Sequence, residues 1–338
     1  MVPLTSTARP RVCVVGAGAI GGYFGVRLAQ GQADVSVLAR GRTLAALNAH
    51  GWILEQDGER IVSNVRTASD AAQLGPQDVV IIAVKAYAVT DIAPMVPHLL
   101  GPGTIVVPAL NGIPWWWREN LRSVDPQGTI AAHIPAANVL GAVIYPACSC
   151  PAPGVTRHHS GTRVVFGEIG SEAGKANGAS SRLRSWVRLL RASGFDAEAS
   201  DDIRTELWKK LLGNACFNPV SLVTGATTDM LIDDVAMNAL LVDLMEEVLA
   251  VGSALGIDAA IRPAQRLEIT RALGKVRTSM LQDADAGRPV ELEAILGAVL
   301  ELAEAHGIAM PASRILYALA RMKTQAMGLP RTLDGDRP

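Results

Sequence analysis

The sequence predicts an α/β N-terminal domain built on a doubly wound parallel sheet, followed by an all-α C-terminal domain. Apolar strands alternate with helical segments before about Ser200. After that point the apolar spacing is almost entirely helical, over 231–255, 263–273, 289–306 and 312–327. A chain of 338 residues is also long enough for two domains.

The domain boundaries follow from composition. We expect the N-terminal domain to span 11–200 and the helical domain 201–328, with flexible tails at 1–10 and 329–338. The first tail lacks the apolar core of a signal peptide, and the second is charged and contains Pro and Gly. The small, polar run 170–181 is typical of a flexible surface loop.

The first elements of the chain are an apolar strand at 11–15, a glycine-rich turn, and a helix that ends near Gln30. The turn reads G-x-G-x-x-G, and this order is the one that a Rossmann-type dinucleotide site requires. Gly16 permits the tight turn, Gly18 lets the backbone approach a pyrophosphate, and Gly21 lets the helix pack on the strand. The pattern predicts a pyrophosphate at the helix N-terminus. The predicted cofactor-binding turn comprises Gly16, Ala17, Gly18, Ala19, Ile20 and Gly21.

The second strand, 34–39, ends at Arg40. A site for NAD usually carries an acid here, which binds the ribose 2′-hydroxyl. A guanidinium suits a 2′-phosphate and cannot accept a hydrogen bond from a hydroxyl group. Arg40 therefore favours NADP(H) over NAD(H), and a solvated loop arginine is the alternative.

Two further polar residues follow apolar strands. Lys85 comes after the strand 78–84, and Asn111 comes after the strand 104–110. Ligands bind at the C-terminal ends of strands in open α/β sheets, so both positions are candidate cofactor contacts. Asn111 precedes Gly112, and a plain turn is the alternative because Asn-Gly is a common turn pair. Segments near 139–145, 154–157 and 162–167 have the composition of later, more antiparallel strands of the same domain.

The segment 206–219 has the apolar spacing of a helix and carries Lys210, Asn214 and Asn218 at i, i+4 and i+8. An amine and two amides beside an apolar face need partners when they are buried. A substrate with a carbonyl and a carboxylate would supply those partners. An ordinary amphipathic surface helix is the alternative.

Together these motifs resemble the ketopantoate reductase (2-dehydropantoate 2-reductase) family, from about Arg11 to about Lys323. Each motif is short, but their combined order and spacing are specific. The resemblance depends on 16–21, 84–87, 111–112, 206–219 and 279–291, and on the match of 305–311 near the end of the chain.

The resemblance implies a role for each matching residue. Lys210 corresponds to the family's general acid, and Glu291 to the carboxylate that holds this lysine. Lys209 lies about 100° away around the helix, which favours Lys210. For Glu291 the alternative is a helix-start acid just after Pro289. The substrate-binding residues that the resemblance implies are Asn111, Asn214, Asn218 and Ser279.

Three features depart from the family pattern. Trp115–Trp117 closely follow the asparagine motif, where we expect them either to shape specificity or to pack in the seam between the two domains. Val276 and Leu296 stand where polar residues near the substrate are expected. These changes concern the choice of substrate more than the reaction.

Charge and cysteine usage exclude several functions. The formal net charge of −1 and the scattered basic residues argue against nucleic acid as a partner, and no apolar run is long enough for a membrane span. Cys148 and Cys150 lack a second pair, and the adjacent His158 and His159 point to opposite faces of a strand. We therefore expect no metal site, a reducing cytoplasmic location, and a monomer or homodimer.

The resulting functional hypothesis is NADPH-dependent reduction of a 2-keto acid to a 2-hydroxy acid. Ketopantoate reduced to (R)-pantoate is the first candidate, with the helical domain placing its polar residues over the nicotinamide. Two alternatives stay open: a related 2-keto acid or opine-type dehydrogenase, and an NADP-binding sensor without activity.

Overall fold

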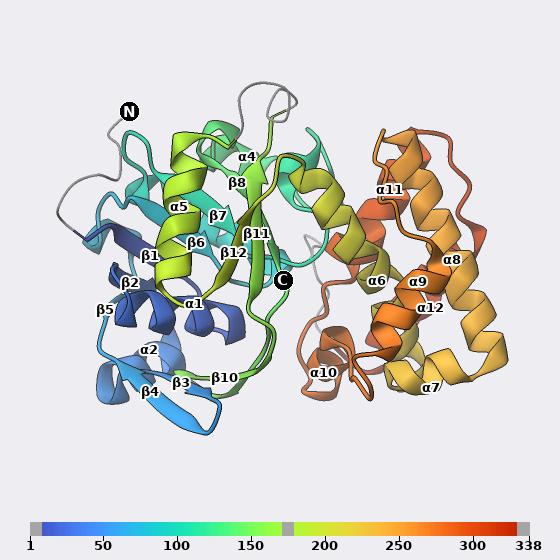
Figure 1. Ribbon diagram of the computed structural model, residues 1–338, viewed down its shortest axis with the longest axis horizontal. Helices are drawn as coiled ribbons and strands as arrows, with labels where there is room; N and C mark the ends of the chain where they lie inside the picture. Colours follow the sequence, from blue (N-terminus) through green and yellow to red (C-terminus); the bar gives the residue numbers. More distant parts are fainter. Residues whose placement is uncertain (1–8, 171–178, 330–338) are drawn as a thin grey trace. The chain divides into compact units, whose positions relative to one another are not determined.

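The computed structural model describes residues 9–170 and 179–329, so most of both expected tails and of the loop 170–181 lie outside the described residues. The chain forms two compact units (Figure 1). Unit 1 comprises Met1–Leu110 with Thr129–Ile203, and unit 2 comprises Asn111–Gly128 with Arg204–Pro338. The segment 111–128 therefore belongs with the helices that follow residue 203, although the strand before it belongs to unit 1.

The main sheet of unit 1 has five parallel strands in the order β5-β2-β1-β6-β7. The chain moves outward from β1 in one direction and then returns to its other side, which confirms the predicted doubly wound sheet. All residues of β6 and β7 are buried, as expected for strands covered on both faces. The strands are β1 Arg11–Val15, β2 Asp34–Leu38, β5 Arg66–Ala68, β6 Val79–Ile82 and β7 Ile105–Pro108.

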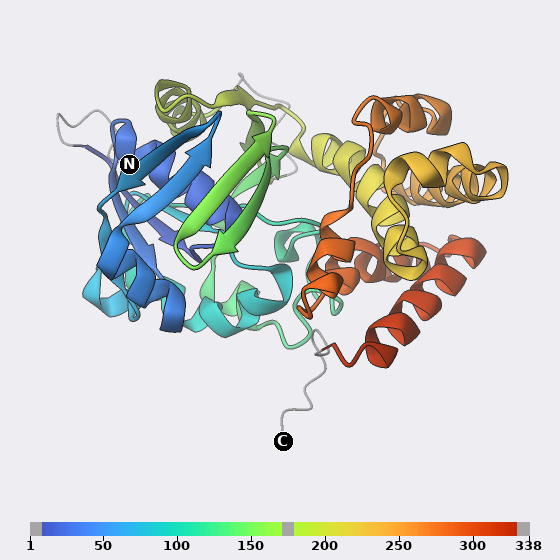
Figure 2. The ribbon, with the colours of Figure 1, turned by 90° about the horizontal axis from the view of Figure 1, so that it is seen from below.

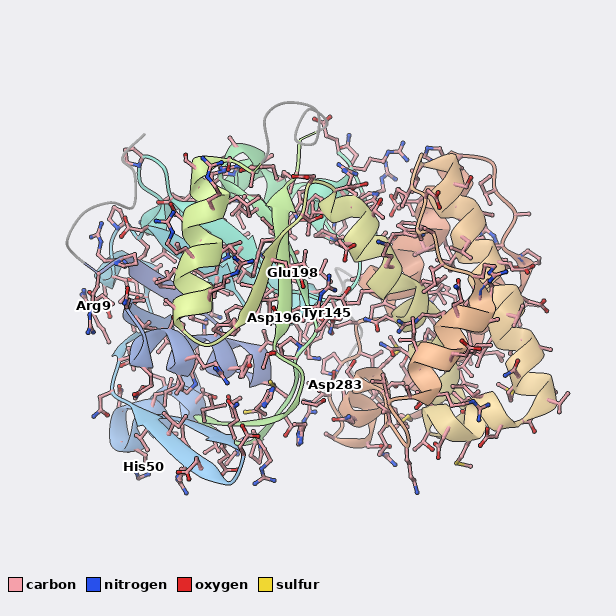
Figure 3. The ribbon with its side chains drawn as sticks, viewed as in Figure 1. Arg9, His50, Tyr145, Asp196, Glu198 and Asp283 are labelled. Atoms are coloured by element: carbon pink, nitrogen blue, oxygen red, sulfur yellow. The ribbon has the colours of Figure 1, made fainter. Side chains whose placement is uncertain are left out.

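Two smaller sheets complete unit 1. β8 Leu140–Ile144 pairs antiparallel with β11 Arg163–Glu168, which pairs parallel with β12 Asp196–Ala199. Glu198 of β12, labelled in Figure 3, accepts hydrogen bonds from Nε and Nη2 of Arg163, both at 2.9 Å. The third sheet has the order β4-β3-β10-β9.

The strand near 154–157 is a later strand of unit 1 with an antiparallel partner, as expected, and it lies outside the main sheet. It is β10 Val155–Ser160, which pairs parallel with β3 Trp52–Gln56 and antiparallel with β9 Ala147–Ala152. Figure 2 shows the blue hairpin of β3 and β4 Glu59–Ser63 beside the green β9–β10 hairpin. Helix α1, Ala19–Gln30, packs closely against β3 and β10. Glycines of α1 make this possible, because they leave room for side chains of the two strands. A Cβ on Gly22 would lie 1.8 Å from Thr156 Oγ1.

The remaining described elements of unit 1 are helical. Ser180 begins α5 by accepting a hydrogen bond from the backbone N–H of Leu183. The helices are α2 Gly41–His50, α3 Val89–Ile92, α4 Thr129–His133 and α5 Ser181–Ala192, with short 3-10 turns η1 Ala71–Gln73, η2 Ala86–Ala88, η3 Ala93–Leu99 and η5 Ala136–Asn138.

All the described elements of unit 2 are helical, which confirms the predicted all-α region. Asp234 divides the segment expected as a single helix, because its carboxylate accepts hydrogen bonds from the first amides of a new helix. Gly256 and Gly307 follow helices with φ of +75° and +67°, as expected for helix-ending glycines. The elements are η4 Trp115–Trp117, α6 Ile203–Thr224, α7 Thr228–Asp233, α8 Val235–Ala254, α9 Pro263–Arg271, α10 Ser279–Asp285, the π-helical turn η6 Glu293–Gly297, α11 Ala298–Ala305 and α12 Pro311–Ala326.

Hydrogen bonds donated by backbone N–H groups attach the segment 111–128 to the helices of unit 2. The N–H of Ile113 donates to the carbonyl of Ala294 at 2.8 Å. The amides of Arg122 and Ser123 donate to the carboxylate of Glu301, at 2.8 and 2.7 Å. Unit 2 therefore consists of two stretches of sequence. The first ends at Gly128, about 75 residues before the second begins at Arg204.

Among residues 9–170 and 179–329, no helix has the length and hydropathy needed to cross a bilayer. The same residues contain no cluster of three or more His, Cys, Asp or Glu side chains suited to a metal ion. His158 and His159 contact different groups, the carbonyl of Gly161 and the hydroxyl of Ser149.

Candidate active site

The glycine-rich turn between β1 and α1 combines one strained position with two close contacts. Gly16 has φ of +101°, a conformation that favours glycine, and a Cβ there would lie 2.7 Å from Val84 Cγ1. A Cβ on Gly21 would lie 1.9 Å from the carbonyl oxygen of Gly16. These two glycines let β1, α1 and the end of β6 approach one another closely.

Gly18 differs from its neighbours because a Cβ there would meet no atom within 4 Å. It occupies the N-cap position of α1, where no side chain caps the helix. Open space above a helix N-terminus with uncapped amides fits a diphosphate. The turn also includes Ala17, which is buried, and Ala19 and Ile20, which are partly buried.

Lys85 and Arg40 both follow strands of the main sheet at their C-terminal ends. Lys85 is partly buried, and it precedes η2 just after β6, the strand beside β1. β1 and β6 lie at the point where the strand order reverses, which is where doubly wound sheets bind ligands. Arg40 is exposed, precedes α2, and places Nη2 3.2 Å from Met95 Sδ.

In unit 2, a single hydrogen bond joins two of the residues singled out from the sequence. Lys210 Nζ on α6 donates to Asn111 Oδ1 at 2.9 Å. The backbone holds Asn111 in place, because the adjacent Gly112 has φ of +81° and packs against Ala294. A Cβ on Gly112 would lie 2.3 Å from the Ala294 carbonyl oxygen. Residues 99 positions apart thus meet at the π-helical turn η6.

The charges around Lys210 have opposing effects on its acidity. Burial lowers the pKa of Lys210 from its usual 10.5 to about 8. The carboxylate of Glu291 raises this pKa, whereas the guanidinium of Arg266 lowers it. Glu291 is itself buried and lies at the start of the helical segment that contains η6. The net effect of burial and of the two charges is a pKa closer to neutral pH than that of an ordinary lysine.

The other substrate-binding candidates differ in burial. Asn214 is partly buried and Asn218 is buried, and α6 places both along the column of Lys210. Pro219 does not end this helix, which continues to Thr224. Ser279 is exposed at the first position of α10. Asp283 of the same helix, labelled in Figure 3, accepts a hydrogen bond from Arg288 at 2.9 Å.

The tryptophan segment packs within unit 2. Trp117 lies 5.6 Å from Trp208 of α6, measured between ring centroids, and the guanidinium of Arg204 lies 4.8 Å from the Trp117 centroid. Trp115–Trp117 are all buried. Of the two positions that depart from the family pattern, Leu296 is fully buried in η6, and the carbonyl of Val276 accepts the N–H of Thr228 at 3.0 Å.

Sequence reasoning missed two parts of the arrangement around the lysine. One is Arg266 on α9, which no motif indicates. The other is the π-helical turn, whose carbonyl at Ala294 holds the asparagine segment. Gly213 could have indicated from sequence that another group packs closely against α6. Glycine is unfavourable inside a helix, so its presence there suggests a packing reason.

A doubly wound sheet with a glycine-rich turn after its first strand, together with a lysine of lowered pKa on a helical unit, is typical of nicotinamide-dependent oxidoreductases. Models of the ketopantoate reductase PanE/ApbA family match residues 12–171, and those of its C-terminal region match 202–324. The chain belongs to the ketopantoate reductase family.

Individual relatives agree with this assignment. A 2-dehydropantoate 2-reductase of Mesorhizobium japonicum is 38% identical over 92% of this chain and 97% of its own length. The structure of a putative ketopantoate reductase from Ralstonia solanacearum is 42% identical, with a TM-score of 0.90 over 96% of this chain and all of that one. A D-mandelate dehydrogenase solved with NADH is 19% identical, covers 95% of this chain and all of its own, and shares the fold with a TM-score of 0.83.

Proposed function

We propose that this enzyme reduces ketopantoate to (R)-pantoate with NADPH, and that Lys210 is its general acid. The observation that carries the assignment of the acid is the bond between Lys210 and Asn111, with the buried Glu291 beside the amine. The relatives named as 2-dehydropantoate 2-reductases support the choice of substrate.

The proposed chemistry adds a hydride to the keto carbon and a proton to its oxygen, so that the carbonyl becomes a secondary alcohol. NADPH, when bound, supplies the hydride. The ammonium of Lys210 supplies the proton and becomes a neutral amine. Asn111 orients the amine by accepting one of its hydrogen bonds, and Glu291 favours the charged form that carries the proton.

Polar residues on unit 2 would hold the substrate. Asn214 and Asn218 share the column of Lys210, and amide groups bind a carboxylate or a hydroxyl without adding net charge. Ser279 can contribute a hydroxyl from the start of α10. We assign these three residues to substrate binding and Lys85 to the cofactor.

The glycine turn, Arg40 and Lys85 support NADPH as the hydride donor. The open space at Gly18 supports a pyrophosphate site, and the guanidinium of Arg40 is exposed beside Met95 at the end of the second strand. A 2′-phosphate would supply the anion that this arginine suits. We assign 11–200 to cofactor binding and 201–328 to substrate binding, with Asn111 contributing to both.

We also propose a cellular location and an oligomeric state for the enzyme. We place it in the cytoplasm as a monomer or homodimer. A ketopantoate reductase of Staphylococcus aureus, 21% identical to this chain, is described as dimeric. Analytical ultracentrifugation of the full chain distinguishes the two states.

The decisive experiment follows NADPH absorbance with ketopantoate and with a panel of other 2-keto acids, for wild type and Lys210→Ala. We expect ketopantoate to be the best substrate and kcat to fall at least about a hundredfold in the variant. Lys209→Ala, on the adjacent residue that pairs with Glu206, is the control and should retain activity.

Other outcomes change the assignment in defined ways. Turnover of another keto acid alone would replace the substrate and keep the mechanism. A requirement for an amino acid as second substrate would indicate an opine-type enzyme. NADPH binding without any turnover would contradict the reductase proposal, and full activity in Lys210→Ala would contradict the role of the lysine.

A further inference from the structure

Gly213 of α6 lies three residues after Lys210 and three residues before Cys216, which places it about 60° around the helix from each of them. Arg266 of α9 packs over Gly213. A Cβ on Gly213 would lie 2.2 Å from Arg266 Nη2 and 2.7 Å from its Cζ. The guanidinium therefore occupies the space that any other residue at position 213 would fill.

The charge of Arg266 affects residues on either side of Gly213 in the sequence. The guanidinium lowers the pKa of Lys210, and it partly offsets the rise in the pKa of Cys216 that burial causes. Lys210 lies three residues before Gly213, and Cys216 lies three residues after it. Their shared response agrees with the position that the missing Cβ defines.

The charged groups that face Lys210 come from three helical segments. Glu291, at the start of the segment containing η6, favours the protonated amine, and Arg266 of α9 disfavours it. On α6 itself, Glu206 and Lys209 form an ion pair of 2.9 Å about one turn before Lys210. The net field at the amine thus depends on a carboxylate and a guanidinium acting in opposite directions.

We propose that Arg266 is a positioning residue that, packed over Gly213, sets how readily Lys210 releases its proton in the ketoacid reduction. This inference rests on the proposed function of Lys210. Arg266 acts through the amine and needs no contact with substrate. Gly213 is required for this arrangement. Because it has no side chain, the guanidinium of Arg266 can lie against α6 close to Lys210.

The variants that test this proposal change the two partners separately. Arg266→Gln removes the charge. Gly213→Ala leaves the charge but places a methyl group where the guanidinium lies. We expect Gly213→Ala to fold, because the obstructed atoms are the far end of a flexible side chain and alanine favours helices. Arg271→Gln, on the same helix α9 and exposed in an ion pair with Asp233, is the matched control.

The primary measurement is the titration of the Lys210 amine itself, by NMR of protein labelled with ¹³C at lysine Cε and assigned with Lys210→Arg. We expect Arg266→Gln and Gly213→Ala each to raise the pKa of Lys210 by roughly one unit. Glu291→Gln should move it in the opposite direction. Arg271→Gln should leave it unchanged, and the double variant Arg266→Gln/Gly213→Ala should shift no further than Arg266→Gln alone.

The second measurement is the pH profile of kcat/KM for ketopantoate reduction. The rate should fall above the pKa of the acid, so the high-pH limb should move upward in both single variants. An unchanged Lys210 titration in Arg266→Gln would overturn the proposal, even if Lys210→Ala is inactive. If Lys210→Ala is fully active, the proposed function fails, while the NMR titration still tests the effect of Arg266 on the amine.

Discussion

At the residue scale, the depressed pKa of Lys210 links the stability of the protein to pH. The folded value is about 8 and the ordinary value 10.5, so the unfolded chain binds more protons between these values. This contribution makes the folded state less stable below about pH 8, and the deficit disappears as the pH rises toward 10.5. The full effect is at most about 3.5 kcal/mol, because one pKa unit corresponds to about 1.4 kcal/mol.

We therefore expect the free energy of unfolding of wild type to rise relative to that of Lys210→Met as the pH increases from 8 to 10.5. Urea unfolding at several pH values measures the difference. Groups other than Lys210 and its neighbours titrate alike in both proteins. A constant difference across this interval would show that the amine titrates normally in the folded state.

The proposed preference for NADPH depends on a single residue, Arg40. We expect Arg40→Asp to raise the KM for NADPH about tenfold or more, because a carboxylate repels a 2′-phosphate. The KM for NADH should change less or fall. Steady-state kinetics with both cofactors measure this, and Arg60→Asp on the exposed strand β4 is a matched control. Equal effects on the two cofactors would remove Arg40 from the 2′-phosphate site.

The bond between Lys210 and Asn111 illustrates what sequence can predict about a site. Each residue was a candidate from its local pattern, a polar column on one helix and the end of one strand. Their contact across 99 residues was not predicted, because no local pattern relates the two segments. The effect of Arg266 was not predictable, because it depends on how α9 packs against α6, and no local pattern encodes that packing.

At the element scale, the contact between Gly112 and η6 holds the asparagine beside the lysine. We expect Gly112→Ala to destabilise the protein by at least about 2 kcal/mol, because an L side chain is strained at positive φ and would also meet a carbonyl oxygen. The kcat should fall about tenfold or more as Asn111 moves away from Lys210.

Gly58 offers a control that separates the two causes. It has φ of +82°, but a Cβ there would meet no atom within 4 Å. Gly58→Ala should therefore show the conformational cost without the loss of activity. Chemical denaturation and steady-state kinetics of both variants provide the test. Equal kcat values would show that the Ala294 contact does not position the asparagine.

Local sequence patterns predicted which segments form helices and strands. They predicted less well where these elements end and which other elements they pair with. The strand near 154–157 exists, but it pairs with β3 because glycines of α1 admit Thr156 and Trp52 at close range. The π-helical turn η6 also escapes prediction, since its apolar periodicity hardly differs from that of the helix around it. Both outcomes depend on contacts between distant segments.

At the scale of the whole molecule, unit 2 is discontinuous in sequence. Residues 111–128 contribute buried apolar side chains to it, and the carboxylate of Glu301 binds two of their amides. We expect a fragment of residues 204–329 to lack cooperative thermal unfolding, because that apolar surface would lie open to water. Far-UV circular dichroism on heating measures this. Joining 111–128 ahead of residue 204 through a Gly/Ser linker of roughly thirty residues should restore a transition. A cooperative transition in the fragment without 111–128 would contradict the expectation.

The tryptophans also have an optical consequence. Trp115, Trp116, Trp117 and Trp208 belong to unit 2, and only Trp52 and Trp186 belong to unit 1. Intrinsic fluorescence therefore reports chiefly on the helical unit. The ring of Trp117 is tilted against those of Trp116 and Trp208, with centroids 6.0 and 5.6 Å away, and this proximity favours energy transfer among the three indoles. If the two units unfold separately, emission will follow the helical unit, while the ultraviolet dichroism of the strands follows the other.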